Sequence, residues 1–530
     1  MMRANTNNEE ELARLRELAA HNTQQLDALR DQHEALRGEL RVVRTERDLL
    51  KERLKAFIRR LFAAKSEARG AEQKDLFFNE AEQLTPNAPP SQEVKLEDKV
   101  TVPAHQRAKR GRKPLDPALP REVIRHELPE TERICPHDGA ALKEIGIEAS
   151  EQLDIVPAQV RVIRHERVKY ACPCCDRGLR TAPAPVRLIP KGLLTESALA
   201  WVITSKYQDA LPLYRQAAML GRFGGECSRN TLAGTVVRVG AAVQPIVNLM
   251  RDTLLDADLM HGDETELQVL KEPGRAAQRK SYLWAQMSGS GPPVRLFTYA
   301  ASRSAQTACK LYDGARGALL TDGYEVYANV AQTYRLVHLG CWAHARRRFV
   351  EAEAALPKAA RTSTQPAAQF IAAIGALYAI EATARDGSVE ERTRLRQQHS
   401  RPALASIEAL LLAQLHSVLP GSLLGQALHY LAAQWPKLVR FVENGRYPID
   451  NNPCENAIRP FVVGRRNWLF ADTVGGATAS ANLYSLIETA KANGIEPYQY
   501  LCALFAALPK ASRLEDYEAL LPWRIALTSP

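Results

Sequence analysis

Three acidic residues are placed where a two-metal site could be built. Asp263 and Asp322 each end a short apolar run and begin a polar one, as residues at the ends of strands do. Glu455 follows in Asp450-Asn-Asn-Pro-Cys-Glu-Asn-Ala-Ile-Arg-Pro, one helical turn before Arg459 and directly after a helix-start signal. Hard divalent cations prefer anionic oxygen ligands, so this set predicts a phosphoryl-transfer site for two Mg²⁺ ions, or for Mn²⁺.

Two of these residues also fit simpler roles. Asp322 precedes a glycine, and Asp-Gly is a common turn pair. Asn452, Pro453 and Glu455 match a capping box, in which the glutamate only bonds the backbone of the cap residue. We expect Asn452 to cap the helix and Glu455 to remain available as the third metal ligand.

The surrounding pattern predicts a sheet that would hold the two aspartates together. In chain order we expect three strands, a helix and two further strands, at 259–266, 281–287, 294–299, 304–311, 318–322 and 334–339. This is the order of a ribonuclease-H-like α/β domain, whose first strand carries one aspartate at its centre and whose fourth carries another at its end. Glu264 should then face away from Asp263, and Gly262 would let a metal or phosphate approach closely.

Cations and an aromatic residue follow the glutamate. Arg459, Arg465, Arg466 and Trp468 predict a surface for phosphates and unstacked bases beside the metal site. The chain has 70 basic and 60 acidic residues, and the net charge of +10 favours a polyanionic partner without deciding the matter by itself. Double-stranded DNA is the partner that these features indicate.

A second basic segment lies at 105–114. Arg110, Arg112 and Lys113 surround a glycine there, which suits contacts with phosphates or the insertion of arginine into a narrow minor groove. A solvated linker would have the same composition.

Paired ligands further along the chain predict a zinc ribbon. Cys172 and Cys175 form a good pair, and Cys135 with Asp138, or with His137 beside it, would supply the other. Because Asp138 stands where a cysteine is usual, a degenerate ribbon without Zn²⁺ is the alternative.

The region 190–250 has a helical pattern. A short helix, a turn with glycine and a second helix capped by Ser228 fit a helix-turn-helix, with Arg229 at the start of the second helix. An ordinary helical connector would explain the pattern nearly as well.

Near the N-terminus, apolar residues repeat with 4-3 spacing from Leu12 to Leu61. Three polar residues, Asn22, His33 and Arg47, interrupt the repeat. This predicts a coiled coil through which the chain self-associates, and the polar positions could fix its register or the number of partners. The alternative is a long helix that packs on its own protein.

The remaining composition bounds the environment of the protein. We expect no membrane span, because no run of about 18 apolar residues occurs, and no secretory signal, because the N-terminus is acidic and polar. The nine cysteines of a 530-residue chain are not needed as disulfides. A cytoplasmic protein with reduced thiols is the expectation.

The chain resembles the transposases of the insertion sequence sixty-six family, which are DDE transposases. Five features carry this resemblance over nearly the whole length: the leucine heptads running into Leu61-Phe-Ala-Ala-Lys-Ser-Glu, Gly111-Arg-Lys-Pro, the region from Cys135 to Cys175, His261-Gly-Asp-Glu-Thr, and Asp450-Asn-Asn-Pro-Cys-Glu-Asn-Ala-Ile-Arg-Pro. The resemblance implies that Asp263, Asp322 and Glu455 are the metal-binding triad, with a helical insertion between the second and third. Cys341-Trp-Ala-His344 resembles the accessory Cys-x-x-His element that several DDE families place after their second aspartate. The alternative is half of a metal site, without an evident other half.

Together these inferences predict a multidomain α+β protein. Its expected parts are a coiled coil at 9–66, a flexible basic linker at 67–125, a zinc-finger-like module at 126–185, a helix-turn-helix-like region at 190–250, a ribonuclease-H-like catalytic domain at 254–348 and 446–490, an all-helical insertion at 349–445 and a helical tail at 491–530. The expected activity is metal-dependent cleavage at the ends of a mobile DNA element and strand transfer into a target by a homo-oligomer, with the need for companion proteins open. A DNA-binding regulator with an inactive catalytic fold and a nuclease that cuts without joining are the alternatives.

Overall fold

The computed structural model describes residues 159–170, 180–357 and 360–527, position 123, and part of the segment from 25 to 51. In that segment the described positions, all helical, are 25, 28–29, 32–33, 35–40, 42–44, 46–48 and 50–51. The predicted zinc ligands and the basic linker residues lie outside the described residues: Cys135, His137, Asp138, Cys172, Cys175, Arg110, Arg112 and Lys113.

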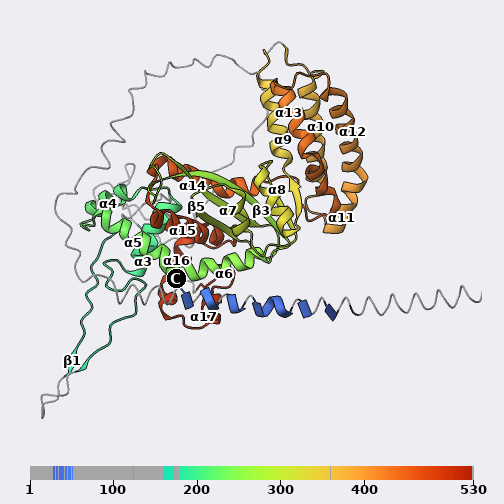
Figure 1. Cartoon of the computed structure of the whole chain (residues 1–530). Helices are drawn as coiled ribbons and strands as arrows, with labels where there is room; N and C mark the ends of the chain where they lie inside the picture. Colours follow the sequence, from blue (N-terminus) through green and yellow to red (C-terminus); the bar gives the residue numbers. More distant parts are fainter. Residues whose placement is uncertain are drawn as a thin grey trace, which may run out of the picture. The chain divides into compact units, whose positions relative to one another are not determined.

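A mixed sheet carries the two aspartates (Figure 1). Its strands are β3 (Leu259–Lys271), β4 (Lys280–Ser288), β5 (Arg295–Ala300), β6 (Ala318–Thr321), β7 (Val337–Gly340) and β8 (Ala471–Thr473). The order across the sheet is β5-β4-β3-β6-β7, and β8 pairs with the second half of β3. The pairs β3–β4 and β4–β5 are antiparallel, whereas β3–β6 and β6–β7 are parallel. All four residues of β6 are buried, which explains its continuous apolar sequence.

Two helices connect the strands around the aspartates. α7 (Ala305–Leu311) is capped by Ser304 and follows β5, as the sequence predicted. α8 (Glu325–Tyr334) joins β6 to β7, a helix that the predicted order omitted. Tyr334, which was assigned to a strand, therefore ends a helix. Parallel neighbouring strands need such a crossover connection, so the parallel pairing itself required this helix.

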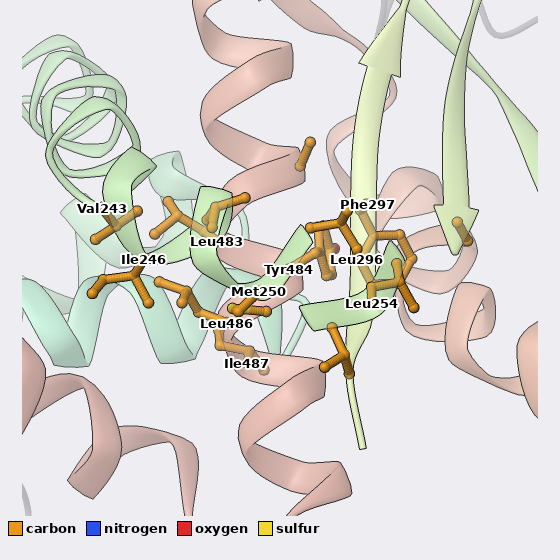
Figure 2. Packing of buried hydrophobic residues seen from close by; sticks show 14 of the residues in the cluster. Val243, Ile246, Met250, Leu254, Leu296, Phe297, Leu483, Tyr484, Leu486 and Ile487 are labelled. Carbon is orange, nitrogen blue, oxygen red and sulfur yellow. The ribbon is translucent and has the colours of Figure 1, made fainter. Parts of the chain in front are cut away.

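Helix α15 (Val474–Ala492) covers the edge strand β5. The hydroxyl oxygen of Ser485 accepts from the backbone N–H of Phe297 at 2.8 Å, and that of Thr489 accepts from the N–H of Arg295 at 3.0 Å. These bonds satisfy backbone groups that an edge strand would otherwise expose. Figure 2 shows the apolar core where β5, α15 and α6 (Gln244–Leu255) meet.

Three helices precede this core. They are α3 (Glu196–Tyr207), α4 (Leu213–Arg222) and α5 (Arg229–Ala242). The backbone of α5 lies against α15, because a methyl group at Gly240 would be only 2.4 Å from the Cβ of Ala479. After α15, α16 (Pro497–Ala507) packs against α3, and α17 (Leu514–Glu518) follows.

The helices between β7 and α14 (Asn452–Trp468) have a second apolar core of their own. They are α9 (Trp342–Ala354), α10 (Pro366–Thr383), α11 (Val389–Leu395), α12 (Arg401–Leu415) and α13 (Leu423–Leu438), with a π-helical turn at Arg396–Ser400 and a 3-10 turn at Val439–Glu443. Phe349 of α9 stacks on Phe370 of α10, with ring centroids 4.4 Å apart. The buried guanidinium of Arg396 donates to both carboxylate oxygens of Glu381 at 2.7 Å, which joins the turn to α10.

Hydropathy and burial bear on the prediction that the chain has no membrane span. Among the described helices, α10 alone is long and apolar enough to cross a membrane by itself, and α5 with α6 passes the same test as a bent pair. Phe370 of α10 and Met250 of α6 are fully buried in the two cores.

Two short strands lie in the region predicted to form the zinc ribbon. β1 (Lys169–Tyr170) pairs antiparallel with β2 (Arg180–Thr181), on either side of residues 171–179.

Candidate active site

Asp263 and Asp322 meet where β3 lies beside β6. In the parallel register Leu259 pairs with Ala318, and His261 pairs with Leu320. Two residues further along both strands, this register places Asp263 beside Asp322. The sheet therefore brings the two aspartates together, and their role in catalysis stays a prediction.

The electrostatics of Asp263 link it to both other acidic residues. Burial and then the neighbouring Asp322 raise the pKa of Asp263 to about 8, and Glu264 and Glu455 add to the rise. The backbone N–H of Glu264 donates to Oδ1 of Asp263 at 2.8 Å and opposes this shift of the pKa. A divalent cation would relieve the repulsion among these carboxylates, so the donor set fits such a metal.

Asp322 also shapes the turn that follows β6. Its Oδ1 accepts a hydrogen bond from the backbone N–H of Tyr324 at 2.9 Å, just before α8 begins. The other carboxylate oxygen takes no part in this bond. The turn role and a metal-ligand role are therefore compatible in one side chain.

Glu455 lies in the first turn of α14, but the predicted cap was wrong. The N-cap residue is Asn451 and makes no side-chain cap bond, while Asn452 is the first helical residue. The carboxylate of Asp450 accepts from the backbone N–H of Asn452 at 3.2 Å and from its side-chain amide at 2.9 Å, which holds Asn452 in a local turn. Asn452 therefore does not cap the helix.

The carboxylate of Glu455 points to α9. Its Oε2 accepts from the guanidinium of Arg347 at 3.2 Å, and its Oε1 lies 3.5 Å from Nδ1 of His344. These contacts leave the capping-box explanation of Glu455 without support in the described residues.

Asn451 joins the strand of Asp263 to the helix of Glu455. Its side-chain amide donates to the carbonyl oxygen of Gly262 at 3.0 Å, and its Oδ1 lies 2.9 Å from Nδ1 of His261. Its backbone N–H donates to Sγ of Cys341 at 3.2 Å. Asn451 is completely buried, and burial lowers the pKa of His261 to about 4. A neutral imidazole that donates to Asn451 fits this environment.

The other face of β3 has a structural role. The phenol of Tyr327 donates to Glu264 at 2.6 Å, and Arg303 lies 3.7 Å from the same carboxylate. A methyl group at Gly262 would be 2.1 Å from the hydroxyl oxygen of Tyr312. The expectation that Gly262 admits a metal or phosphate was wrong, because tyrosine side chains from α8 and from the end of α7 fill that space.

The three predicted ligands do not form the tightest group in the described chain. Sγ of Cys341, a ring nitrogen of His344 and a carboxylate oxygen of Glu455 all lie within 4.8 Å of one another, and no second such group occurs among the described residues. Asp263, Asp322 and Glu455 do not form such a group. Their charges are coupled, because Asp322 and Glu455 both raise the pKa of Asp263.

The helices between β7 and α14 also reach the site. The ring of Tyr430, from α13, fills the space beside Gly323, because a methyl group there would be 2.6 Å from it. The guanidinium of Arg348 lies 4.1 Å over the ring of Tyr430. Residues of α9 and α13 therefore border the carboxylates.

The predicted DNA-binding residues of α14 have different surroundings. Arg459 and Arg466 are exposed, whereas Arg465 is half-buried and donates to the carbonyl oxygen of Glu266. Trp468 packs edge-on against Phe461, with ring centroids 5.4 Å apart. Two exposed arginines thus remain on this surface, and Trp468 is a packing residue.

The region predicted as helix-turn-helix-like contains the two expected helices, and its role stays a prediction. α4 and α5 are separated by a turn, and the hydroxyl of Ser228 caps α5 by accepting from the N–H of Thr231 at 3.1 Å. Arg229 is half-buried at the start of α5. One face of α5 is buried by other helices, while Gly234 and Arg238 in its middle are exposed.

Sequence reasoning missed several residues that surround the glutamate. Arg347 is three residues after His344 on α9, and this helical spacing could have indicated one shared face. Asn451 was read only as part of a helix start. The contacts of Asn451 with β3 depend on residues far away in the chain, and no local pattern reports them.

Four family models match the chain. The Transposase IS66 family matches residues 191–479, and the zinc-finger binding domain of transposase IS66 matches residues 132–176. The IS66 C-terminal element matches residues 485–523, and the model described as Transposase C of IS166 homeodomain matches residues 49–124.

Similar proteins occur in Sinorhizobium fredii (strain NBRC 101917 / NGR234). The uncharacterized protein y4qI is 34% identical over 434 residues, which cover 78% of this chain and 79% of that protein. The uncharacterized protein y4jD is 33% identical over 423 residues, which cover 76% of this chain and 81% of that protein. Since the first family model spans more than half of the sequence, the chain belongs to the IS66 family of transposases.

Proposed function

We propose that the protein is a DDE transposase that cleaves the ends of a mobile DNA element and joins them to target DNA. The observation that carries this proposal is the coupling of Asp263 to both Asp322 and Glu455, in a chain of the IS66 family. The three side chains come from two neighbouring strands and a helix, and all are carboxylates. They would hold the metal ions, with Asp263 as the shared ligand.

The topology of the sheet supports a ribonuclease-H-like catalytic domain. The order β5-β4-β3-β6-β7, with three antiparallel strands followed by two parallel ones, is the arrangement expected of that fold. We place this domain at 254–348 and 446–490 and the helical insertion at 349–445. Outside this domain we propose the other parts predicted from the sequence: the coiled coil at 9–66, the basic linker at 67–125, the zinc-finger-like module at 126–185, the helix-turn-helix-like region at 190–250 and the helical tail at 491–530.

Two Mg²⁺ ions, or Mn²⁺, would supply Lewis-acid activation of the attacking oxygen and stabilise the leaving oxygen when bound. The chain itself would hold the substrate. Arg459 and Arg466 are exposed on α14 and would contact phosphates of the DNA. Arg347 already contacts Glu455 and would be a further cation beside the scissile phosphate.

Recognition and assembly would use other parts of the chain. We propose that Arg110, Arg112, Lys113 and Arg229 contact double-stranded DNA, and that the zinc-finger region binds Zn²⁺ and recognises the element ends. The match to a zinc-finger binding domain at 132–176 supports this assignment. A homo-oligomer in the cytoplasm, with or without companion proteins, would join two ends at once.

A strand-transfer assay tests the proposal. Purified protein, Mg²⁺ and a labelled DNA carrying the element end are incubated with a target plasmid, and joined and cleaved products are separated. Joined product supports the transposase, whereas cleavage alone indicates the nuclease and binding without either product indicates the regulator.

Variants of the triad sharpen this test. Asp263→Asn, Asp322→Asn and Glu455→Gln should each abolish joining and leave DNA binding intact, because only metal ligation is lost. Asp258→Asn is a matched control, since Asp258 is an exposed carboxylate immediately before β3. Retained joining in any triad variant contradicts that residue's assignment.

A further inference from the structure

Side chains of three different ligand types converge at the start of α9. Sγ of Cys341, a ring nitrogen of His344 and a carboxylate oxygen of Glu455 all lie within 4.8 Å of one another. Nδ1 of His344 is 3.5 Å from Oε1 of Glu455. Two ligands of one tetrahedral ion with bonds of about 2.0–2.3 Å are separated by about 3.3–3.7 Å. The spacing of the imidazole and the carboxylate thus matches a shared cation.

Two of these atoms face each other without a hydrogen bond. Nδ1 of His344 and Oε1 of Glu455 are both enclosed, and neither makes a hydrogen bond within the described part of the chain. An enclosed polar atom without a hydrogen bond destabilises the fold unless a ligand compensates for it. The other oxygen of Glu455 accepts from Arg347 at 3.2 Å, which leaves Oε1 directed toward His344.

Cys341 is prepared as a ligand by the backbone around it. The residue is buried, 1% exposed, and is the N-cap of α9. The backbone N–H of Asn451 donates to its Sγ at 3.2 Å. Burial raises the pKa of the Cys341 thiol to about 12, and the amide donors oppose that rise. A bound cation would displace the proton, and donors around a ligand atom tune metal sites.

We propose that Cys341, His344 and Glu455 form a binding site for a thiophilic divalent cation, best matched by Zn²⁺, that is separate from the pair of ions at the aspartates. Thiolate and imidazole ligands favour Zn²⁺ over Mg²⁺, and three protein ligands leave a fourth position open. On binding, the thiol of Cys341 releases its proton to solvent and the sulfur takes the metal in its place. The proposal goes beyond the transposase reaction and shares only Glu455 with it.

The shared glutamate gives the site a regulatory consequence. Zn²⁺ would take Oε1 of Glu455, and Arg347 already contacts Oε2, so neither oxygen of Glu455 would stay free for a catalytic ion beside Asp263. Zn²⁺ at this site would therefore withdraw Glu455 from the triad and inhibit strand transfer supported by Mg²⁺.

Cobalt is a suitable probe because Co²⁺ occupies zinc sites and absorbs light when a thiolate binds it. The full-length chain would carry serine at Cys135, Cys172, Cys174 and Cys175, so that the zinc-finger region cannot contribute a thiolate. We expect a thiolate-to-cobalt charge-transfer band at about one equivalent of Co²⁺. The band should be lost on Cys341→Ser and retained on Cys309→Ser, a matched control at a half-buried cysteine on α7.

The other two ligands provide independent checks. His344→Gln and Glu455→Gln should keep the band but weaken Co²⁺ binding by more than about 10-fold. Loss of a residue that only supports a ligand already costs about 10-fold or more, so loss of a ligand itself should cost at least that much. Absence of the band in the starting protein, or its survival in Cys341→Ser, overturns the proposal. Should Cys341→Ser fail to fold, unchanged Co²⁺ affinity in folded His344→Gln overturns it equally.

These readouts are independent of transposition. Asp263→Asn should lose strand transfer and retain the cobalt band, which separates the new site from the catalytic one. A failure of strand transfer in the unaltered protein would count against the proposed function and leave the spectroscopic result unaffected.

Discussion

Asp263 is the residue whose environment departs furthest from that of an ordinary carboxyl. Its pKa rises from 3.8 to about 8 through burial and then through Asp322. Between these two pH values the folded chain keeps a proton on Asp263 that the unfolded chain releases. Stability in the absence of metal therefore falls as pH rises through this range and levels off above about pH 8.

Asp263→Asn should remove this dependence. In EDTA the variant should be more stable than the original protein at pH 8, by on the order of 1–2 kcal/mol after allowance for solvent relaxation, and nearly equal to it at pH 4. Thermal unfolding at both pH values measures the difference. An equal stability difference at the two pH values would contradict the assigned cause.

Arg347 would compete with a metal ion for the third carboxylate. Arg347→Ala removes the cation that lies 3.2 Å from Glu455, and half of that arginine side chain is exposed. An exposed ion pair contributes about 0.2–1 kcal/mol, so Mn²⁺ should bind about 1.5- to 5-fold more tightly without it. Calorimetric titration with Mn²⁺ tests this, with Arg346→Ala on the same helix as the control. Unchanged or weaker binding in Arg347→Ala would refute the role.

At the scale of elements, Asn451 fastens α14 to β3. Asn451→Ala would leave His261 and the carbonyl oxygen of Gly262 without their partner inside the protein, so it should destabilise the fold by about 1–3 kcal/mol. It should also weaken Mn²⁺ binding, because Glu455 is one turn further along the same helix. Unfolding and metal titrations should show no such change in Asn452→Ala, whose side chain contacts Asp450 at the surface. Equal effects in both variants would remove Asn451 from this role.

Local sequence patterns predicted the elements better than the contacts between them. Apolar runs ending in Asp263 and Asp322 indicated two strand ends. Asp322 does follow β6 directly, but Asp263 lies within β3, which continues to Lys271, so that strand end was wrong. The β3–β6 register places the two residues side by side. α8 was missed because the predicted order left 325–333 without an element and assigned Tyr334 to the next strand. The contacts of Glu455 with α9 join residues 108 positions apart, so no local spacing could reveal them.

At the scale of the whole molecule, the N-terminal helix bears on assembly. Five seam residues of the 4-3 repeat are at least half exposed in the single chain: Leu29, Leu36, Leu40, Val43 and Leu50. Pairing of such seams between chains would bury them. This exposure supports the proposed self-association over a helix that packs fully on its own protein.

Substitutions in this seam test the assembly. Leu36→Glu combined with Leu40→Glu should convert an oligomer to a monomer, because charges at seam positions oppose pairing. Light scattering after size-exclusion chromatography measures the mass. The control Glu39→Ala changes an exposed position outside the seam. An unchanged mass in the double variant would exclude this segment as the oligomer interface.

The packing of α15 against β5 has a consequence for the nascent chain, because the two elements are synthesised at different times. Glu455 leaves the ribosome about 130 residues after Asp322, which takes roughly 7–26 s at a synthesis rate of about 5–20 residues per second. Ser485 and Thr489, which cover the edge of β5, arrive later still. A nascent chain therefore carries two of the three proposed ligands on a sheet with an open edge. If the proposed triad is correct, this chain would be inactive, and the edge of β5 would stay open to misassembly until Thr489 has been synthesised.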